Sequence, residues 1–340
     1  MSSIAIIGQG YMANAHATAW AAIGQADAIK YVCSPRPTAG SVPAATCAQY
    51  VADLDAVLAD EAVRFVSVCT PTPTHRDIAL ALLAAGKHVL LEKPIALSVE
   101  DGLAIADAAN RSTGSLMVAQ VVRFFAGYQR LREARDAGRF GDVLSVRARR
   151  LSPKPDWAAW MKDEEQSGGM LIDFSTHDID QLNLFLGRPI EVYATQAGPS
   201  APAEITVRYH DGGVGHVESF MNNSAGVPFT STIDVLGAAA LGHYEFSAVS
   251  ATKESAESSG ANVNSWHVFS AAGNTVQEIR ADDPYGRQIA YFWKQASSGK
   301  AFEVAPVEAA IVSLEVALAA KRSLREGLPM AITSVVSDLR

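Results

Sequence analysis

The feature that most constrains this chain is a glycine-rich turn close to its start, formed by Gly8, Gln9, Gly10, Tyr11, Met12 and Ala13. An apolar β-branched run precedes the turn and a helix-compatible stretch follows it, which predicts strand, turn and helix in that order. In this setting a pyrophosphate meets backbone N–H groups and the positive end of the helix dipole. Gly8 permits the tight turn, Gly10 removes the Cβ that would block the phosphate, and Ala13 gives small-residue helix packing. A structural glycine turn is the alternative, but the position favours dinucleotide binding.

Strands and helices alternate through the first third of the chain. Predicted strands lie at 4–7, 29–33, 64–69, 88–91 and 116–121, and predicted helices at 13–23, 54–58, 78–85 and 99–109. This alternation is typical of parallel βαβ units, and with the glycine turn it predicts a Rossmann sheet. The rhythm changes after residue 121, so we expect a dinucleotide-binding domain over 1–121 and a second domain over 122–340.

The second domain has a different pattern. Alternating stretches at 204–209, 215–221 and 230–236 predict antiparallel strands. A helix near 128–137, a strand at 143–149 and a closing helix at 306–325 accompany them, and residues 250–264 have the composition of a loop or hairpin tip. The pattern therefore predicts an α/β domain with helices on one face of a sheet.

Composition limits the partners of this protein. The 340 residues carry a formal net charge of −8 with no basic run, which gives no attraction for nucleic acid or anionic membrane. The three cysteines form no CxxC pair, and two of them lie in predicted strands, which favours a reducing compartment. No signal-peptide pattern is evident, and no apolar segment reaches about 18 residues. We expect a soluble cytoplasmic protein with neither a nucleic-acid nor a membrane partner.

The end of the second predicted strand lacks the acidic residue that would hold the adenosine ribose hydroxyls. The sequence there reads Cys33, Ser34, Pro35 and Arg36. No carboxylate repels a 2′-phosphate, while the hydroxyl of Ser34 and the guanidinium of Arg36 are suited to it. The sequence therefore favours NADP(H), with NAD(H) possible if Arg36 is only a solvated loop residue.

A lysine follows the fourth predicted strand, in the sequence Glu92-Lys93-Pro94. Ligands of open α/β folds bind at this carboxyl edge of the sheet. Glu92 can orient the ammonium group of Lys93, while Pro94 restricts the backbone. Most lysines are simply solvated, but this position favours a functional one.

A second polar motif runs from Gly168 to Asp180. Asp173 and His177 are four residues apart, so on an α-helix they share one face. An imidazole beside a carboxylate is a proton-transfer pair. The alternatives are an N-capping Asp173 with a core histidine, or two metal ligands. No obvious further neutral ligands accompany them, so we expect no metal.

Together these motifs resemble those of the Gfo/Idh/MocA family, the relatives of glucose-fructose oxidoreductase and inositol dehydrogenase, over nearly the whole chain. The residues that carry the resemblance are the glycine turn, the stretch Thr70-Pro71-Thr72-Pro73-Thr74-His75, the stretch Glu92-Lys93-Pro94, and the motif at 168–180. The resemblance implies a Rossmann domain followed by an α/β domain with a large open, mostly antiparallel sheet for substrate binding and oligomerisation. A homodimer or homotetramer is the expected assembly.

The resemblance also implies roles for individual residues. Lys93, Asp173 and His177 form the catalytic and substrate-binding group. The cofactor-binding residues that it adds are Thr70, Thr72, His75, Glu92, Lys93 and Gln120, with Gln120 at the end of the fifth predicted strand beside the nicotinamide. Three positions depart from the family pattern: Ala13 replaces the third glycine, Ser175 stands where glycine is frequent, and Gln120 replaces an Asn-containing strand end.

The expected activity is the NAD(P)-dependent interconversion of a secondary hydroxyl and a ketone on a sugar, inositol or related polyol. His177 would be the general acid/base, Lys93 would polarise the oxygen, and Asp173 would orient them. Trp157 and Trp160 either present flat faces to a sugar ring or pack in the interior. The alternatives are a non-catalytic NAD(P)-binding sensor and a reductase of an imine or double bond.

Overall fold

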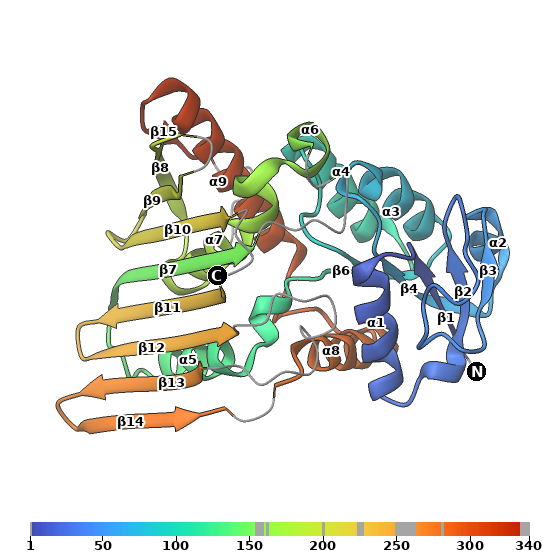
Figure 1. Ribbon diagram of the computed structural model, residues 1–340, viewed down its shortest axis with the longest axis horizontal. Helices are drawn as coiled ribbons and strands as arrows, with labels where there is room; N and C mark the ends of the chain where they lie inside the picture. The colour runs from blue at the N-terminus through green and yellow to red at the C-terminus, as the bar shows by residue number, and fades with distance from the viewer. Residues whose placement is uncertain are drawn as a thin grey trace. The chain divides into compact units, whose positions relative to one another are not determined.

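The computed structural model describes residues 2–153, 160, 163–198, 201–222, 228–248, 263–279 and 282–333 (Figure 1). The chain divides into two compact units. The first unit comprises Met1–Phe124 and Asp283–Ile311, and the second comprises Phe125–Asp282 and Val312–Arg340. The segment Asp283–Ile311 follows the second domain's strands in sequence but packs with the first unit, a difference from the expected division at residue 121.

A six-stranded parallel sheet forms the first unit, in the order β3-β2-β1-β4-β5-β6. Its strands are β1 (Ser3–Ile7), β2 (Ile29–Cys33), β3 (Gln49–Val51), β4 (Val63–Val68), β5 (His88–Leu91) and β6 (Leu116–Val118). The predicted Rossmann class is confirmed. The sequence pattern does not predict β3, and its strand to residue 121 is wrong at the end: β6 stops at Val118 and a 3₁₀ turn, η3 (Val121–Phe124), follows.

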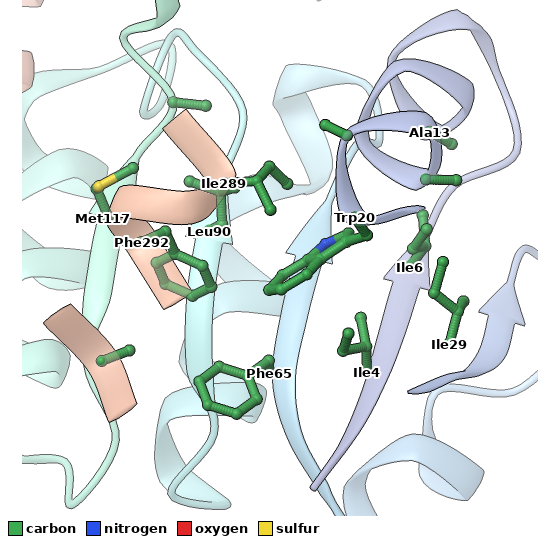
Figure 2. Packing of buried hydrophobic residues seen from close by; sticks show 14 of the residues in the cluster. Ile4, Ile6, Ala13, Trp20, Ile29, Phe65, Leu90, Met117, Ile289 and Phe292 are labelled. Atoms are coloured by element: carbon green, nitrogen blue, oxygen red, sulfur yellow. The ribbon is translucent and has the colours of Figure 1, made fainter. Parts of the chain in front are cut away.

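Helices pack on this sheet, and aromatic rings join two of them to it. The helices are α1 (Tyr11–Ala22), α2 (Asp55–Ala59), α3 (His75–Ala84), α4 (Val99–Arg111) and α8 (Pro284–Ser298), with short 3₁₀ turns η1 (Ala26–Ala28) and η2 (Thr72–Thr74). Trp20 of α1 lies 6.3 Å from Phe292 of α8 and 6.4 Å from Phe65 of β4, between ring centroids (Figure 2). Its indole N–H also donates to Ser67 at 3.0 Å. Burial of these rings explains why α8 belongs with the Rossmann unit.

A nine-stranded mixed sheet forms the second unit, in the order β14-β13-β12-β11-β7-β10-β9-β8-β15 (Figure 1). Its strands are β7 (Val143–Pro153), β8 (Pro189–Gln196), β9 (Ala203–Tyr209), β10 (Val214–Asn222), β11 (Phe229–Gly237), β12 (Ala240–Ala248), β13 (Val263–Ser270), β14 (Gly273–Glu278) and β15 (Met330–Ala331). Neighbours are antiparallel except β7 and β10, which are parallel. The predicted, mostly antiparallel sheet is confirmed; most of the expected loop at 250–264 lies outside the described residues.

One face of this sheet is covered and the other is open. The helical elements of the second unit are α5 (Ala126–Asp136), α6 (Glu164–Ser167), the π-helix η5 (Met170–Phe174), α7 (Thr176–Leu186) and, from Val312 onward, α9 (Val307–Glu326). Along β7, Val146, Ala148 and Arg150 are buried beneath helices, whereas Arg147 and Arg149 are exposed. This alternation is that of a sheet with one solvated face. Among the described residues, no helix is long and apolar enough to cross a membrane.

Candidate functional site

The glycine turn has the geometry that the sequence predicts. Gly8 adopts φ +113°, and a Cβ there would lie 2.6 Å from the carbonyl oxygen of Cys69, so only glycine fits. Gly10 is the N-cap residue of α1, where a Cβ would meet nothing within 4 Å and no side chain caps the helix. These features fit a pyrophosphate. A phosphate can come close to the backbone at Gly10, and no capping side chain occupies the N-terminus of α1.

Gln9, inside the turn, ties it to the loop that follows β2. Its amide nitrogen donates to the carbonyl of Arg36 at 2.8 Å, and its amide oxygen accepts the N–H of Thr38 at 2.9 Å. Ser34 is half-buried at the strand end and Arg36 is exposed. The proposed phosphate-recognising loop is therefore anchored to the glycine turn by a residue that the fingerprint leaves unspecified.

The threonine-rich stretch after β4 is held by a buried histidine. The ring nitrogens of His75 lie 2.9 Å from the carbonyl oxygen of Pro94 and 3.0 Å from that of Thr70. Burial lowers the pKa of His75, against the effect of these carbonyls. Thr72 is also buried, and the hydroxyl of Thr74 bonds that of Thr70 at 2.7 Å. His75 thus links the start of the threonine-rich stretch to Pro94, the residue after Lys93.

The Glu92-Lys93-Pro94 stretch lies directly after β5, as predicted. Glu92 is buried, and its Oε1 lies 2.8 Å from Nε2 of His16, which is fully buried on α1. Its other oxygen, Oε2, accepts the backbone N–H of Lys93 at 3.2 Å. Lys93 itself is half-buried. Sequence reasoning does not single out His16; its place on the helix that begins at the glycine turn is the only signal.

The second motif is not one continuous α-helix. Asp173 lies in the π-helix η5 and His177 near the start of α7, and the N–H of Ser175 donates to Met170, five residues back, at 2.9 Å. Asp173 and His177 are therefore not neighbours on one regular α-helix, as the sequence suggests, because the chain between them includes part of a wider π-helical turn. Asp173 is buried and His177 is half-buried.

A buried ion pair anchors the start of α7. Asp178 accepts two hydrogen bonds from Arg150 of β7, at 2.8 Å from Nε and 2.7 Å from Nη2. Burial opposes the charge of Arg150, but Asp178 raises the pKa of its guanidinium above the ordinary value. Burial raises the pKa of Asp178, against the attraction of Arg150. Tyr128 lies 3.5 Å from Arg150 and shares a 2.9 Å hydrogen bond with Ser231. Burial raises the pKa of Tyr128 to about 12.

The remaining predicted residues have varied positions. Gln120 is buried two residues beyond β6, so it is not within a strand, and its N–H donates to Val118 at 2.8 Å. Trp160 is half-buried, and Trp157 lies outside the described residues. Within the described ranges, no group of three or more His, Cys, Asp or Glu side chains is arranged to hold a metal. Lys93 belongs to the first unit, and Asp173 and His177 belong to the second.

Family comparisons account for both units. Residues 2–120 match the model of the "Oxidoreductase family, NAD-binding Rossmann fold", and residues 128–240 match the "GFO/IDH/MocA C-terminal domain". The chain belongs to the Gfo/Idh/MocA oxidoreductase family. The resemblance that the motifs suggest is therefore confirmed. The protein is a Gfo/Idh/MocA oxidoreductase with an NAD-binding Rossmann domain.

Individual members of the family extend the comparison. Inositol 2-dehydrogenase of Rhizobium meliloti (strain 1021) is 33% identical over 56% of this chain and 57% of its own length, so less than two thirds of that relative is covered. scyllo-Inositol 2-dehydrogenase (NAD(+)) of Bacillus subtilis (strain 168) is 25% identical over 81% of this chain and 80% of its own. Among solved structures, levoglucosan dehydrogenase in complex with NADH and L-sorbose has a TM-score of 0.81 at 20% identity, covering 98% of this chain and 99% of its own. That likeness shows the shared fold.

Proposed function

We propose that this Gfo/Idh/MocA protein interconverts a secondary hydroxyl and a ketone on a sugar, inositol or related polyol, with a nicotinamide cofactor supplying hydride transfer. The names of the two inositol dehydrogenase relatives support this substrate class. One observation carries the proposal. In each unit a half-buried proton-transfer group, Lys93 or His177, adjoins a buried acid whose own partner holds it in place.

Each residue has a distinct proposed role. His177 takes the hydroxyl proton or returns it, and Lys93 polarises the substrate oxygen with its ammonium group. Asp173, buried in η5, orients these proton-transfer residues. Cofactor binding rests on the glycine turn and on the N-terminus of α1, so it needs neither Lys93 nor His177.

The test separates catalysis from cofactor binding. Lys93→Met and His177→Ala are each expected to lower turnover on a polyol panel by about 10²-fold or more, the usual scale of acid/base assistance. Cofactor affinity, measured by fluorescence, should be retained. Lys300→Met and His210→Ala, at exposed positions, are the matched controls. Near-normal turnover in both test variants would refute the assignment, and cofactor binding without any turnover in the unaltered protein would favour a sensor.

We further propose that NADP(H) is preferred over NAD(H). The end of β2 presents Ser34 and Arg36 where a carboxylate would repel a 2′-phosphate, and Gln9 anchors the Arg36 loop to the glycine turn. The levoglucosan dehydrogenase structure contains NADH, so the preference is proposed from the residues of this chain alone. Arg36→Ala should weaken NADP binding by about 1 to 3 kcal/mol and leave NAD binding little changed. Equal losses for both cofactors would contradict contact with the 2′-phosphate.

The open face of the nine-stranded sheet supports a homo-oligomer. It exposes Leu236, Phe269 and Val276 beside charged residues, and sheet faces with such side chains are commonly covered in assemblies. Light scattering at micromolar concentration should give at least twice the chain mass of 36.0 kDa.

The thiols of Cys33, Cys47 and Cys69 are free, which supports a reducing compartment such as the cytoplasm.

A further inference from the structure

Two hydrogen bonds link the helix that follows the glycine turn to the peptide of Lys93. α1 begins at Tyr11, directly after the turn, and carries His16 on its buried side. Nε2 of His16 lies 2.8 Å from Oε1 of Glu92, and Oε2 of Glu92 accepts the N–H of Lys93 at 3.2 Å. The carboxylate of Glu92 is therefore held from one side by α1 and itself holds the backbone of the lysine.

Hydrogen bonding indicates which form of His16 takes part. Its Nδ1 is wholly buried and meets no hydrogen-bond partner among the described residues. An imidazolium would leave a buried Nδ1–H donor unsatisfied, which is unfavourable in the interior. A neutral ring with its proton on Nε2 avoids this cost and donates to Glu92. Oε1 of Glu92 then accepts from His16, while Oε2 accepts from the N–H of Lys93.

The other end of the lysine segment is also fixed. His75 lies 2.9 Å from the carbonyl oxygen of Pro94, the residue after Lys93. The backbone of Lys93 is therefore held on its N-terminal side through Glu92 and just beyond it through His75. This arrangement sets the direction of the Lys93 side chain, which is half-buried.

We propose that His16 is a positioning residue for Lys93 and acts through the carboxylate of Glu92. Without the Nε2–H donor, Glu92 loses the hydrogen bond from α1 and can turn away from the N–H of Lys93. The lysine is then misplaced, and a displacement of about 1 Å is sufficient to cost up to 10²-fold in rate. The inference rests on the proposed function, because it takes Lys93 as the group that polarises the substrate oxygen.

The experiment compares two amides at position 16. The side-chain nitrogen of glutamine reaches the place of Nε2, whereas that of asparagine reaches only the place of Nδ1. His16→Asn and His16→Leu should lower kcat by about 10- to 100-fold with KM for the polyol and cofactor affinity changed less than about threefold. His16→Gln should restore kcat to within about threefold, because it donates to Glu92 again. Thermal unfolding of all three variants is measured in parallel.

The possible outcomes are distinct. A purely structural role predicts that kcat follows stability, whichever amide is present, and this result would overturn the inference. Equal kcat in His16→Asn and the unaltered enzyme would overturn it as well. Lys93→Met belongs in the same panel: if that variant retains turnover, the proposed function fails first, whereas its inactivity together with full activity of His16→Asn defeats the positioning role alone. If His16→Leu does not fold, the asparagine and glutamine pair decides the question.

Discussion

The two units anchor their motifs with the same arrangement but different chemistry. In the first unit a buried acid, Glu92, pairs with His16, and in the second unit Asp178 pairs with Arg150. In both, the proposed catalytic residue next to the acid in sequence is only half-buried. The buried acid thus fixes the backbone, and its neighbour is left able to meet a substrate.

The partner of each acid makes the difference. An imidazole can be neutral, so the pair of Glu92 and His16 does not require two buried charges. A single contact of 2.8 Å joins the two side chains. A guanidinium is always charged, and the buried Arg150 donates two hydrogen bonds to the buried Asp178. Breaking the second pair therefore leaves an isolated charge in the interior, which is the more damaging event.

The largest effect should come from removing Arg150. Arg150→Met strands the Asp178 carboxylate, so we expect the free energy of unfolding to fall by about 3 to 5 kcal/mol. Guanidinium unfolding measures the loss, and hydrogen exchange along β7 assigns it to the second unit. Arg149→Met is the matched control, because Arg149 is its exposed neighbour and pairs with Glu218 at 2.9 Å on the open face. The control should lose less than about 1 kcal/mol; equal losses would show that the buried pair has no special weight.

A smaller effect on the free energy of unfolding should distinguish the second unit from the first at alkaline pH. Burial raises the pKa of Tyr128, in the Arg150 network, from 10.0 to about 12. Between these values the unfolded chain has released the proton and the folded chain still holds it, so stability falls as pH rises. From pH 9 to 11 the loss from this group is about 1.3 kcal/mol. Tyr128→Phe should remove that part of the slope, whereas Tyr193→Phe, at an exposed position, should not. An unchanged slope in Tyr128→Phe would contradict burial of the ionisable hydroxyl.

Much of the fold could be predicted because it follows from local pattern. The runs at Ile4–Ile7 and Ile29–Cys33 indicate strands by their short length and apolar, β-branched residues, and the glycine turn marks where the first strand ends. The three-residue strand β3 could not be predicted, since Gln49–Val51 is too short to show a period. The packing of α8 with the first unit could not be predicted either, because it depends on a contact between Phe292 and Trp20, which are far apart in sequence.

The candidate site divides in the same way. Lys93 and His177 stand out because each lies in a compact polar motif, so neighbouring letters reveal them. Their supports do not stand out: His16 is 76 residues from Glu92 and Arg150 is 28 from Asp178, and no local rule links them. The wider turn at η5 depends on a bond from Ser175 to Met170 that the spacing of residues does not encode.

The smallest effect should come from His75, on the acidic side and in the first unit. Burial lowers its pKa, so between that lowered value and the unfolded value of about 6.5 the unfolded chain binds a proton that the folded chain refuses. Stability should therefore fall as pH decreases below about 6.5. The carbonyls of Thr70 and Pro94 favour the protonated ring and offset part of this shift, which is why we rank the effect below that of Tyr128. His75→Gln should flatten the acidic limb in urea unfolding between about pH 5 and 7, and His210→Gln, at an exposed site, should leave it as it is. If the acidic limb is as steep in His75→Gln as in the unaltered chain, other groups carry it, and the first unit does not differ from the second in the way that its buried imidazole predicts.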